Sequence, residues 1–298
     1  MANRWPLVAL AALAGCSTGF EDPSLVKDLR VLAMKAAPPE VIFRDPGDIA
    51  TPIVFTTLLA DPGQAGRTLH CVLQTCVLDT RERRCLDPST TTRLAEFDCR
   101  DGENPVSVTI PGPVLLAVQK QQAGWPAYDP GTPVYVELVV TGGKTELHAV
   151  KDVVFSPPTP AGRVANSNPV IASVSVDGTA VAVAVDGTVA LPLPATGKVR
   201  LEIVPADGSE EDYVVPTYTG DTRHLKELNR LAYYSDTAAF SSQSRSDTSS
   251  DTQKQDGPPD LWSDWTVPKP AGAGEPRFWF VALDGRGGVA WATGTKAD

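Results

Sequence analysis

Five cysteines carry the most reactive side chains of this 298-residue sequence. Cys16 stands alone near the N-terminus, whereas Cys71, Cys76, Cys85 and Cys99 lie close together. Clustered thiols can either bind a zinc ion or form disulfide bonds. The spacing is C-x4-C, then eight residues, then C-x13-C, without the paired C-x2-C units typical of zinc sites. The cluster therefore favours disulfides, and we predict no metal site here.

Residues 1–15 have the pattern of a bacterial export signal. Arg4 supplies a positive charge, and Leu7 to Leu13 form an apolar run too short to cross a bilayer, which requires about 20 residues. The run closes on Leu13-Ala14-Gly15-Cys16, which resembles the bacterial lipobox at every position. An ordinary secretory signal cleaved after Ala12-Leu13-Ala14 is the alternative, but it leaves the complete lipobox as a coincidence.

The lipobox resemblance implies that the thiol of Cys16 receives a diacylglyceryl group and that Cys16 becomes the first residue after cleavage. N-acylation of this residue, for example with palmitate, adds a further chain, and two or more chains give stable anchoring. Ser17 stands where an aspartate would favour retention at the inner membrane, so it favours the outer membrane. Residues 16–27 then form a mostly polar tether.

Export also favours disulfides, because oxidising compartments allow them and four clustered cysteines can pair completely. If residues 71–78 form one strand, Cys71 and Cys76 are an odd number of positions apart and point to opposite faces, which argues against a bond between them. Two pairings remain: Cys71 with Cys99 and Cys76 with Cys85, or Cys71 with Cys85 and Cys76 with Cys99. We favour the first, nested pairing.

The other residue patterns give little support for an enzyme. The sequence contains no motif of the serine hydrolases, zinc proteases or nucleotide-binding loops. Ser24 and Lys27 fit S-x-x-K, but the partner motifs K-T-G and S-D-N are missing and the pair falls in the predicted tether. His70, His148 and His224 lie far apart in the sequence, and we interpret them as surface or rim residues. We therefore predict no catalytic residue and no cofactor.

Two acidic segments raise the question of calcium. Asp247, Asp251 and Asp256 lie in a Ser-rich stretch, and Glu210-Glu211-Asp212 follow the Asp207-Gly208 turn. Calcium needs six to eight oxygen ligands held in place, commonly by an Asp-x-Asp-x-Asp run with a turning glycine. This run does not occur, so we interpret both segments as solvated loop charge.

Aromatic residues gather near the C-terminus. The group consists of Trp262, Trp265, Phe278, Trp279, Phe280 and Trp291. Aromatic side chains on the rim of a β-sandwich can stack on sugar rings or anchor a protein partner. Along a strand, Phe278 and Phe280 share one face and Trp279 takes the other. We take the four tryptophans as candidate binding residues, with core packing as the alternative.

Composition limits the classes of partner. Asp and Glu number 36 against 26 Lys and Arg, so the net charge is −10, which argues against nucleic acid, whose phosphates attract clustered Lys and Arg. Hydrophobic residues make up 42% of the chain, which is enough to build a core. Apart from residues 1–15, no apolar stretch is long enough to suggest a second membrane element.

Short runs rich in Val, Ile, Leu and Thr predict a β-sandwich over residues 28–156. Asp-Pro-Gly, Pro-Gly-Pro and Gly-Gly turns separate these runs. The expected strands are Leu29–Met34, Thr51–Leu59, Leu69–Leu78, Val106–Ile110, Val114–Val118, Val134–Val140 and Leu147–Phe155.

A Pro-rich linker is predicted at residues 157–167, followed by a second sandwich over residues 168–298. Asp177-Gly178 and Asp186-Gly187 are strong hairpin signals. The segment His224–Ala232 fits either a strand or a helical stripe. Residues 241–257 contain no hydrophobic residue, so we predict a disordered Ser/Asp-rich loop there. The other expected strands are Ile171–Val176, Ala180–Val185, Thr188–Leu191, Val199–Val204, Tyr213–Val215, Leu228–Tyr234, Arg277–Leu283 and Val289–Ala292.

Several of these segments carry a family resemblance. They are Leu29-Arg30-Val31-Leu32-Ala33 with Pro38-Pro39-Glu40, Asn168-Pro169 with Asp177-Gly178, and Asp284-Gly285-Arg286-Gly287-Gly288-Val289-Ala290-Trp291. Together they resemble the uncharacterised myxobacterial-type outer-membrane lipoproteins with tandem Ig-like or PKD-like domains. The resemblance implies a lipid anchor and two Ig-like domains, and it implies no activity. The insertion at residues 241–257 departs from the usual pattern.

The sequence thus predicts an all-β protein, with two Ig-like β-sandwich domains in tandem after a lipoprotein signal peptide. The function that fits is a non-catalytic binding or scaffold module of the cell envelope, attached to the outer membrane through acylated Cys16. Other envelope proteins or surface glycans are the expected partners. The alternatives are an envelope hydrolase whose site only the fold assembles, and a passive structural spacer.

Overall fold

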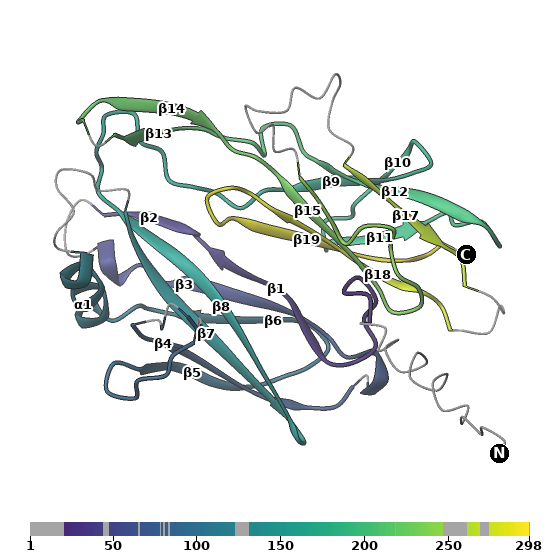
Figure 1. Cartoon of the computed structure of the whole chain (residues 1–298), viewed down its shortest axis with the longest axis horizontal. Coiled ribbons are helices and arrows are strands. Elements are labelled where there is room, and N and C mark those ends of the chain that lie inside the picture. The colour runs from purple at the N-terminus through teal and green to yellow at the C-terminus, as the bar shows by residue number, and fades with distance from the viewer. Residues whose placement is uncertain are drawn as a thin grey trace, which may run out of the picture.

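The computed structural model describes residues 21–297, apart from 44–47, 65, 78, 80, 83, 123–130, 218, 247–260 and 269–273. Nearly all regular structure in the described part is β, and it forms two sandwiches that follow one another along the chain (Figure 1). The break between them falls between β8, which ends at Ser156, and β9, which begins at Ile171. Two Ig-like β-sandwiches in tandem are the fold class that the sequence predicted.

The first sandwich consists of a three-stranded and a five-stranded sheet. The smaller sheet has the order β1 (Arg30–Ala37), β3 (Ile53–Ala60), β6 (Gly102–Val108). The larger has the order β2 (Glu40–Ile42), β8 (Thr145–Ser156), β7 (Thr132–Gly142), β4 (Leu69–Thr75), β5 (Thr92–Cys99). Short 3-10 helices span Asp48–Ala50 and Pro62–Gln64.

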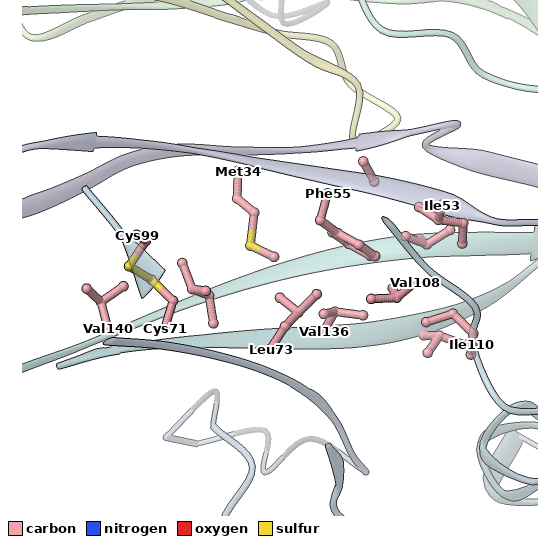
Figure 2. Close-up of a cluster of buried hydrophobic side chains, with 14 of the residues drawn as sticks. Met34, Ile53, Phe55, Cys71, Leu73, Cys99, Val108, Ile110, Val136 and Val140 are labelled. Atoms are coloured by element: carbon pink, nitrogen blue, oxygen red, sulfur yellow. A yellow bond between two sulfur atoms is a disulfide. The ribbon is translucent and has the colours of Figure 1, made fainter. Parts of the chain in front are cut away.

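The core of the first sandwich lies between its two sheets. Figure 2 shows Met34 and Phe55 pointing from the smaller sheet towards Leu73 and Val136 of the larger one. Along β7, every second side chain from Val134 onward is fully buried, as the two-residue period of a strand requires when one face meets a core. This burial, rather than hydrogen bonding, fixes the register of the strands.

Two disulfides connect the four clustered cysteines in the nested pairing favoured above. Cys71 of β4 is bonded to Cys99 of β5, with 5.9 Å between their Cα atoms, and this bond lies in the core. Cys76 is bonded to Cys85, with 5.5 Å between their Cα atoms, and closes the loop that follows β4. The prediction of two disulfides and of their pairing is therefore confirmed.

One predicted strand of the first half is wrong. Residues 114–118 lie in a helix, α1 (Gly112–Gln122). A strand would bury alternate residues, but Leu116 is 55% exposed whereas Leu115 and Val118, three positions apart, are buried. Proline at the start of the segment suits the first helical turn, where its missing N–H costs nothing, and the amide of Val114 donates to the Pro111 carbonyl (2.9 Å).

The second sandwich has a four-stranded and a five-stranded sheet, with a separate two-stranded hairpin. The first sheet has the order β10 (Thr179–Ala182), β9 (Ile171–Val176), β12 (Lys198–Pro205), β17 (Trp262–Thr266). The second has the order β11 (Thr188–Leu191), β19 (Val289–Lys296), β18 (Arg277–Leu283), β15 (Arg230–Ser235), β16 (Ser244–Ser246). The hairpin pairs β13 (Asp212–Pro216) with β14 (Thr222–Lys226).

The two Asp-Gly signals lead to different turns. Asp177 (φ 49°) and Gly178 (φ 87°) join β9 to β10 in a two-residue hairpin, as predicted. Asp186-Gly187 instead carries the chain to the other sheet, where β11 pairs in parallel with the last strand, β19. The first sandwich repeats this arrangement, because its short β2 pairs in parallel with its last strand, β8.

The structure decides several segments that the sequence left open or misjudged. Residues 224–232 form no helix: residues 224–226 belong to β14, residues 230–232 belong to β15, and residues 227–229 connect the two strands. Within the predicted disordered loop, residues 244–246 form strand β16 beside β15, and residues 247–257 lie outside the described residues. The sequence did not identify β2, β5 or β17, each of which is an edge strand of its sheet.

Residues 21–27, the described part of the predicted tether, are packed against the second sandwich. The amide of Val26 donates to the Ser235 carbonyl (2.8 Å), and the amide of Ser235 donates to the Ser24 carbonyl (2.9 Å). The side chains of Ser24 and Val26 are fully buried. The Ser24 hydroxyl accepts a hydrogen bond from the Phe240 amide, so the serine of the S-x-x-K motif has a structural role.

Candidate functional site

The structure does not gather the four candidate tryptophans into an exposed patch. Trp265 is 1% exposed and lies in the core of the second sandwich, with its ring 4.9 Å from that of Phe278. Trp279 and Trp291 are 4% and 7% exposed and face the first sandwich. Trp262 is half-buried, and the Arg200 guanidinium stacks 3.7 Å from its ring centre. Core packing, the alternative weighed from the sequence, describes three of the four.

The outer faces of one sheet from each sandwich pack against each other. Leu58 and Ala60 of β3 contact the outward side chains of β15, β18 and β19, and Val26 joins them from the N-terminal segment. We call this cluster the interdomain core; its members are Val26, Leu58, Ala60, Ala232, Trp279, Val281, Val289 and Trp291. Because these side chains are apolar and buried, separating the sandwiches would expose them to water.

Polar contacts border the interdomain core on the side where β18 begins. The Arg277 guanidinium bonds the Asp101 carboxylate of the first sandwich (2.6 Å) and the Asp236 carboxylate of its own (3.0 Å). On the other side, the Asn168 side chain donates to the Ala36 carbonyl (2.7 Å) and accepts from the Val289 amide (2.9 Å). Through Asp101 and Ala36, respectively, Arg277 and Asn168 each connect the second half of the chain to the first sandwich.

A buried charge cluster lies at the opposite end, around the turn between β18 and β19. Arg286 in this turn bonds the carboxylates of Glu211 (3.3 Å) and Glu227 (3.2 Å) through Nη1. Its Nη2 bonds the Glu40 carboxylate of β2 and the Val164 carbonyl. We call Arg286 and its carboxylate partners the Arg286 cluster. One guanidinium therefore links the first sandwich, the linker and the second sandwich.

The Pro-rich linker is held by the same cluster. Glu40 accepts hydrogen bonds from the Asn166 amide (2.8 Å) and from Arg163 (3.2 Å). Asn166 is buried, and its side-chain amide donates to Asp284 (3.2 Å). Residues 163–166, which belong to the predicted Pro-rich linker, are thus fixed to both sandwiches.

Glu227 is a carboxyl group of the cluster whose pKa is strongly raised. Its side chain is 1% exposed, and burial raises its pKa to about 7, with further raising by the charges of Asp284 and Glu211. The hydrogen bond from the Glu211 amide (3.0 Å) and the charge of Arg286 oppose this rise. A buried carboxyl group that titrates near neutral pH is a common feature of catalytic sites. Here its oxygens face Arg286 and a backbone amide rather than an open cavity.

A second carboxylate with many partners lies beneath the Cys76–Cys85 loop. Buried Glu137 accepts hydrogen bonds from Gln74 (2.9 Å) and from the Cys85 amide (3.1 Å). His148 lies between Glu137 and Glu146, 2.9 Å from each. The sequence interpretation of His148 as a surface or rim residue overlooked this contact, because Glu137 and His148 come together only through the pairing of β7 with β8. His70 and His224 are exposed.

A groove with a volume of about 420 Å³ lies between the sandwiches. Strands β1 and β8 line it from the first sandwich, and β15, β16, β18 and β19 line it from the second. We call it the interdomain groove. Most of its side chains are apolar, and its charged residues are Lys151, Asp152 and Arg230.

Several predicted features fall outside the described residues. They are the signal peptide (residues 1–15), Cys16, Asp247, Asp251 and Asp256. Among the residues that the structure does describe, no three His, Cys, Asp or Glu side chains are placed to hold a metal ion. In the same residues, no helix has the length and apolar character needed to cross a membrane.

Comparisons with known proteins give similarity of fold without a family. No family model and no curated protein matches the chain. Among solved structures, the two tandem V-type regions of a v-region-containing chitin binding protein match 90% of this chain and 100% of their own, at 10% identity and a TM-score of 0.29. A chimeric titin Z1Z2-Z1Z2 tandem matches 83% of this chain and 91% of its own, at 8% identity and a TM-score of 0.21.

A protein of unknown function from Porphyromonas gingivalis W83 is similar over 89% of this chain and 99% of its own, at 12% identity and a TM-score of 0.20. Identities and scores this low carry no functional argument.

Proposed function

We propose that this protein is a non-catalytic binding or scaffold module of the bacterial cell envelope, held at the outer membrane by an acylated Cys16. The observation that carries the proposal is the interdomain core, which supports treating the two sandwiches as one rigid body. Domains joined by a linker normally move relative to each other unless their interface is large and hydrophobic. Here the apolar contact is reinforced by Arg277 on one side and Arg286 on the other.

Rigidity suits a protein that presents a surface at a defined place. Glu21, the first described residue, is five positions after Cys16, and an extended chain of that length reaches at most about 18 Å. With Cys16 in the membrane, the docking of residues 24–26 on β15 would keep the folded body close to the lipid. The proposed anchor and the folded body would then act together rather than through a long flexible tether.

Envelope proteins are the partners we propose in preference to glycans. Glycan binding rested on an aromatic platform at the rim of the second sandwich, and Trp265, Trp279 and Trp291 are buried. The carboxylates of the Arg286 cluster are bonded to arginines and backbone amides, which gives the hydrolase alternative no open pair of carboxylates at this place.

The test of the anchor is the distribution of the full chain and its Cys16→Ser variant between membrane and soluble fractions. We expect the unaltered chain to incorporate labelled palmitate and to sediment with the outer membrane. The variant should do neither, and retention of a cleaved Cys16→Ser chain in the membrane would contradict the proposal.

The test of the binding role is cross-linking in cells followed by co-purification, with the soluble variant as control. A small, reproducible set of envelope proteins enriched with the anchored form is the expected result. Recovery of no partner, together with an unchanged phenotype when the second sandwich is replaced by an unrelated one, would support the spacer instead.

A further inference from the structure

The interdomain groove has the size and position of a small-molecule site. Its volume of about 420 Å³ lies within the range of roughly 300–1,000 Å³ found for ligand pockets, which often occur between domains. Both of its walls belong to a body fixed by the interdomain core, so the groove persists without a ligand to hold it open.

Apolar side chains from both sandwiches line most of the groove. Val31 and Leu32 of β1 and Ala149 of β8 form one side. Tyr234 of β15 and Leu283 of β18 lie on the other, with Ala232, Val281 and Val289 from the edge of the interdomain core. Water forms few hydrogen bonds with apolar walls. Transfer of an apolar group from water into this groove is therefore favourable.

Two cationic residues line the groove near one of its ends. Arg230 pairs with Leu283 across β15 and β18, which places it at the end where the β18–β19 turn begins. Within the same turn, the Gly287 carbonyl accepts a hydrogen bond from the buried Lys151 ammonium. Arg230 and Lys151 therefore both lie near the β18–β19 turn, and both residues line the groove.

The charge at this end is unbalanced. Asp152 is the one acidic residue among the described lining residues, and its carboxylate lies 3.6 Å from the Lys151 ammonium. The backbone of Arg230 pairs with β16 and β18, but its guanidinium forms neither a hydrogen bond nor an ion pair with another side chain that the structure describes. One carboxylate thus faces two cations, and an anionic group placed there would complete the pairing and form charge-assisted hydrogen bonds.

We propose that the interdomain groove binds a small amphipathic anion. Its head would be a carboxylate or a similar oxyanion at Lys151 and Arg230, and its body would be a single apolar chain or ring along Leu32, Ala149 and Tyr234. This site goes beyond the binding or scaffold role and does not depend on the anchor at Cys16. An extended apolar peptide lying along β1 is a different class of ligand and serves as an outcome of the test.

The first experiment measures binding of decanoate to the full-length Cys16→Ser chain by calorimetry, below the concentration at which decanoate forms micelles. Decanol, which has the same chain without the charge, and decylamine, which reverses it, are the comparison ligands. We expect saturable one-to-one binding of decanoate, at least tenfold tighter than that of decanol, and no binding of decylamine.

The second experiment assigns the head-group contact. Arg230→Gln changes an exposed residue without altering the core, and we expect it to weaken decanoate binding about tenfold while leaving decanol unaffected. Arg223→Gln on β14 is the matched control, because Arg223 is also an exposed strand arginine but does not line the groove. It should change the affinity for neither decanoate nor decanol. Lys151→Met should weaken decanoate binding more than Arg230→Gln does. Cooperative thermal unfolding of this variant would show that it keeps its fold.

The third experiment fills the apolar part of the groove. Ala149→Leu adds bulk at a partly buried lining position, and we expect it to weaken both decanoate and decanol without changing the circular dichroism spectrum. The proposal would be overturned by the absence of saturable binding or by decylamine binding as tightly as decanoate. Unchanged decanoate affinity in Arg230→Gln, or tighter binding of an uncharged apolar pentapeptide than of decanoate, would overturn it as well.

Discussion

The indole Nε1 of Trp291 on β19 donates a hydrogen bond of 2.5 Å to the Glu103 carboxylate on β6, across the boundary between the two sandwiches. The Lys35 ammonium lies 4.5 Å from the centre of the same ring. Trp291, which the sequence suggests as a binding residue, thus forms part of the interface between the sandwiches. Its removal should therefore affect stability before it affects recognition.

We expect Trp291→Phe to lower the free energy of unfolding by about 1 kcal/mol or somewhat more, because an aromatic ring of smaller size remains but the hydrogen bond to Glu103 is lost. Urea unfolding followed by circular dichroism measures this change. Trp262→Phe, which alters a half-buried indole outside the interdomain core, should have the smaller effect, and equal effects of the two changes would refute the assignment.

The Arg286 cluster should make stability depend on pH through Glu227. Its pKa in the folded chain, about 7, lies above the ordinary value of 4.5, so the folded state holds this proton more tightly than the unfolded state does. The stabilisation is complete below pH 4.5 and is lost as the pH rises through 7. One pKa unit corresponds to about 1.4 kcal/mol, so the loss could reach about 3 kcal/mol.

Glu227→Gln should remove that loss, because the amide can still accept from Arg286 and carries no charge. We expect the variant to be more stable than the unaltered chain at pH 8 and to show a flatter stability profile between pH 5 and pH 8. Thermal unfolding across this range provides the measurement. Glu275→Gln, at an exposed position, is the control and should leave the profile as it is.

Removal of the Arg286 guanidinium should allow the two sandwiches to unfold independently of each other. Arg286→Met leaves the buried carboxylates of Glu40 and Glu227 without their shared cation, and losing one partner of a buried ion pair typically costs about 3–5 kcal/mol. We expect calorimetry to show two unfolding transitions in place of one. Arg223→Met on β14 should retain a single transition, and a single transition in both would argue against this role for Arg286.

The two disulfides should contribute unequally. Cys71–Cys99 closes a separation of 28 residues and Cys76–Cys85 one of 9, so the chain-entropy model assigns the first about 1 kcal/mol more. The double alanine variants, compared by urea unfolding, test this order. A greater loss of stability from the Cys76–Cys85 variant would contradict the order that loop length predicts.

The turn that carries Arg286 requires glycine at position 288. A Cβ atom there would lie 1.9 Å from Asp284 Oδ2 and 2.7 Å from the Ser167 carbonyl oxygen, and the second contact is with backbone that cannot move aside. We expect Gly288→Ala to lower the unfolding temperature by several degrees. Gly274→Ala, where a Cβ meets open space, should leave that temperature unchanged.

The sequence by itself determined the local structure of this protein. Alternating apolar residues predicted most strands, because a strand with one buried face has a two-residue period. Asp177-Gly178 specified a hairpin through its positive φ angles, and the even cluster of cysteines indicated two disulfides whose favoured pairing is confirmed. The segment at 114–118 misled because Val and Leu suit both a strand and a helix, and only burial at three-residue spacing distinguishes them.

Only the tertiary structure decided which apolar faces meet. Trp279 and Trp291 lie on the outer face of a sheet, and the same pattern would describe an exposed binding rim or a buried joint. Leu58, which packs in the same cluster, is more than 200 positions away in the sequence, and a local sequence pattern cannot predict such a contact. The Arg286 cluster and the interdomain groove arise in the same way, because their charges come from segments that folding alone brings together.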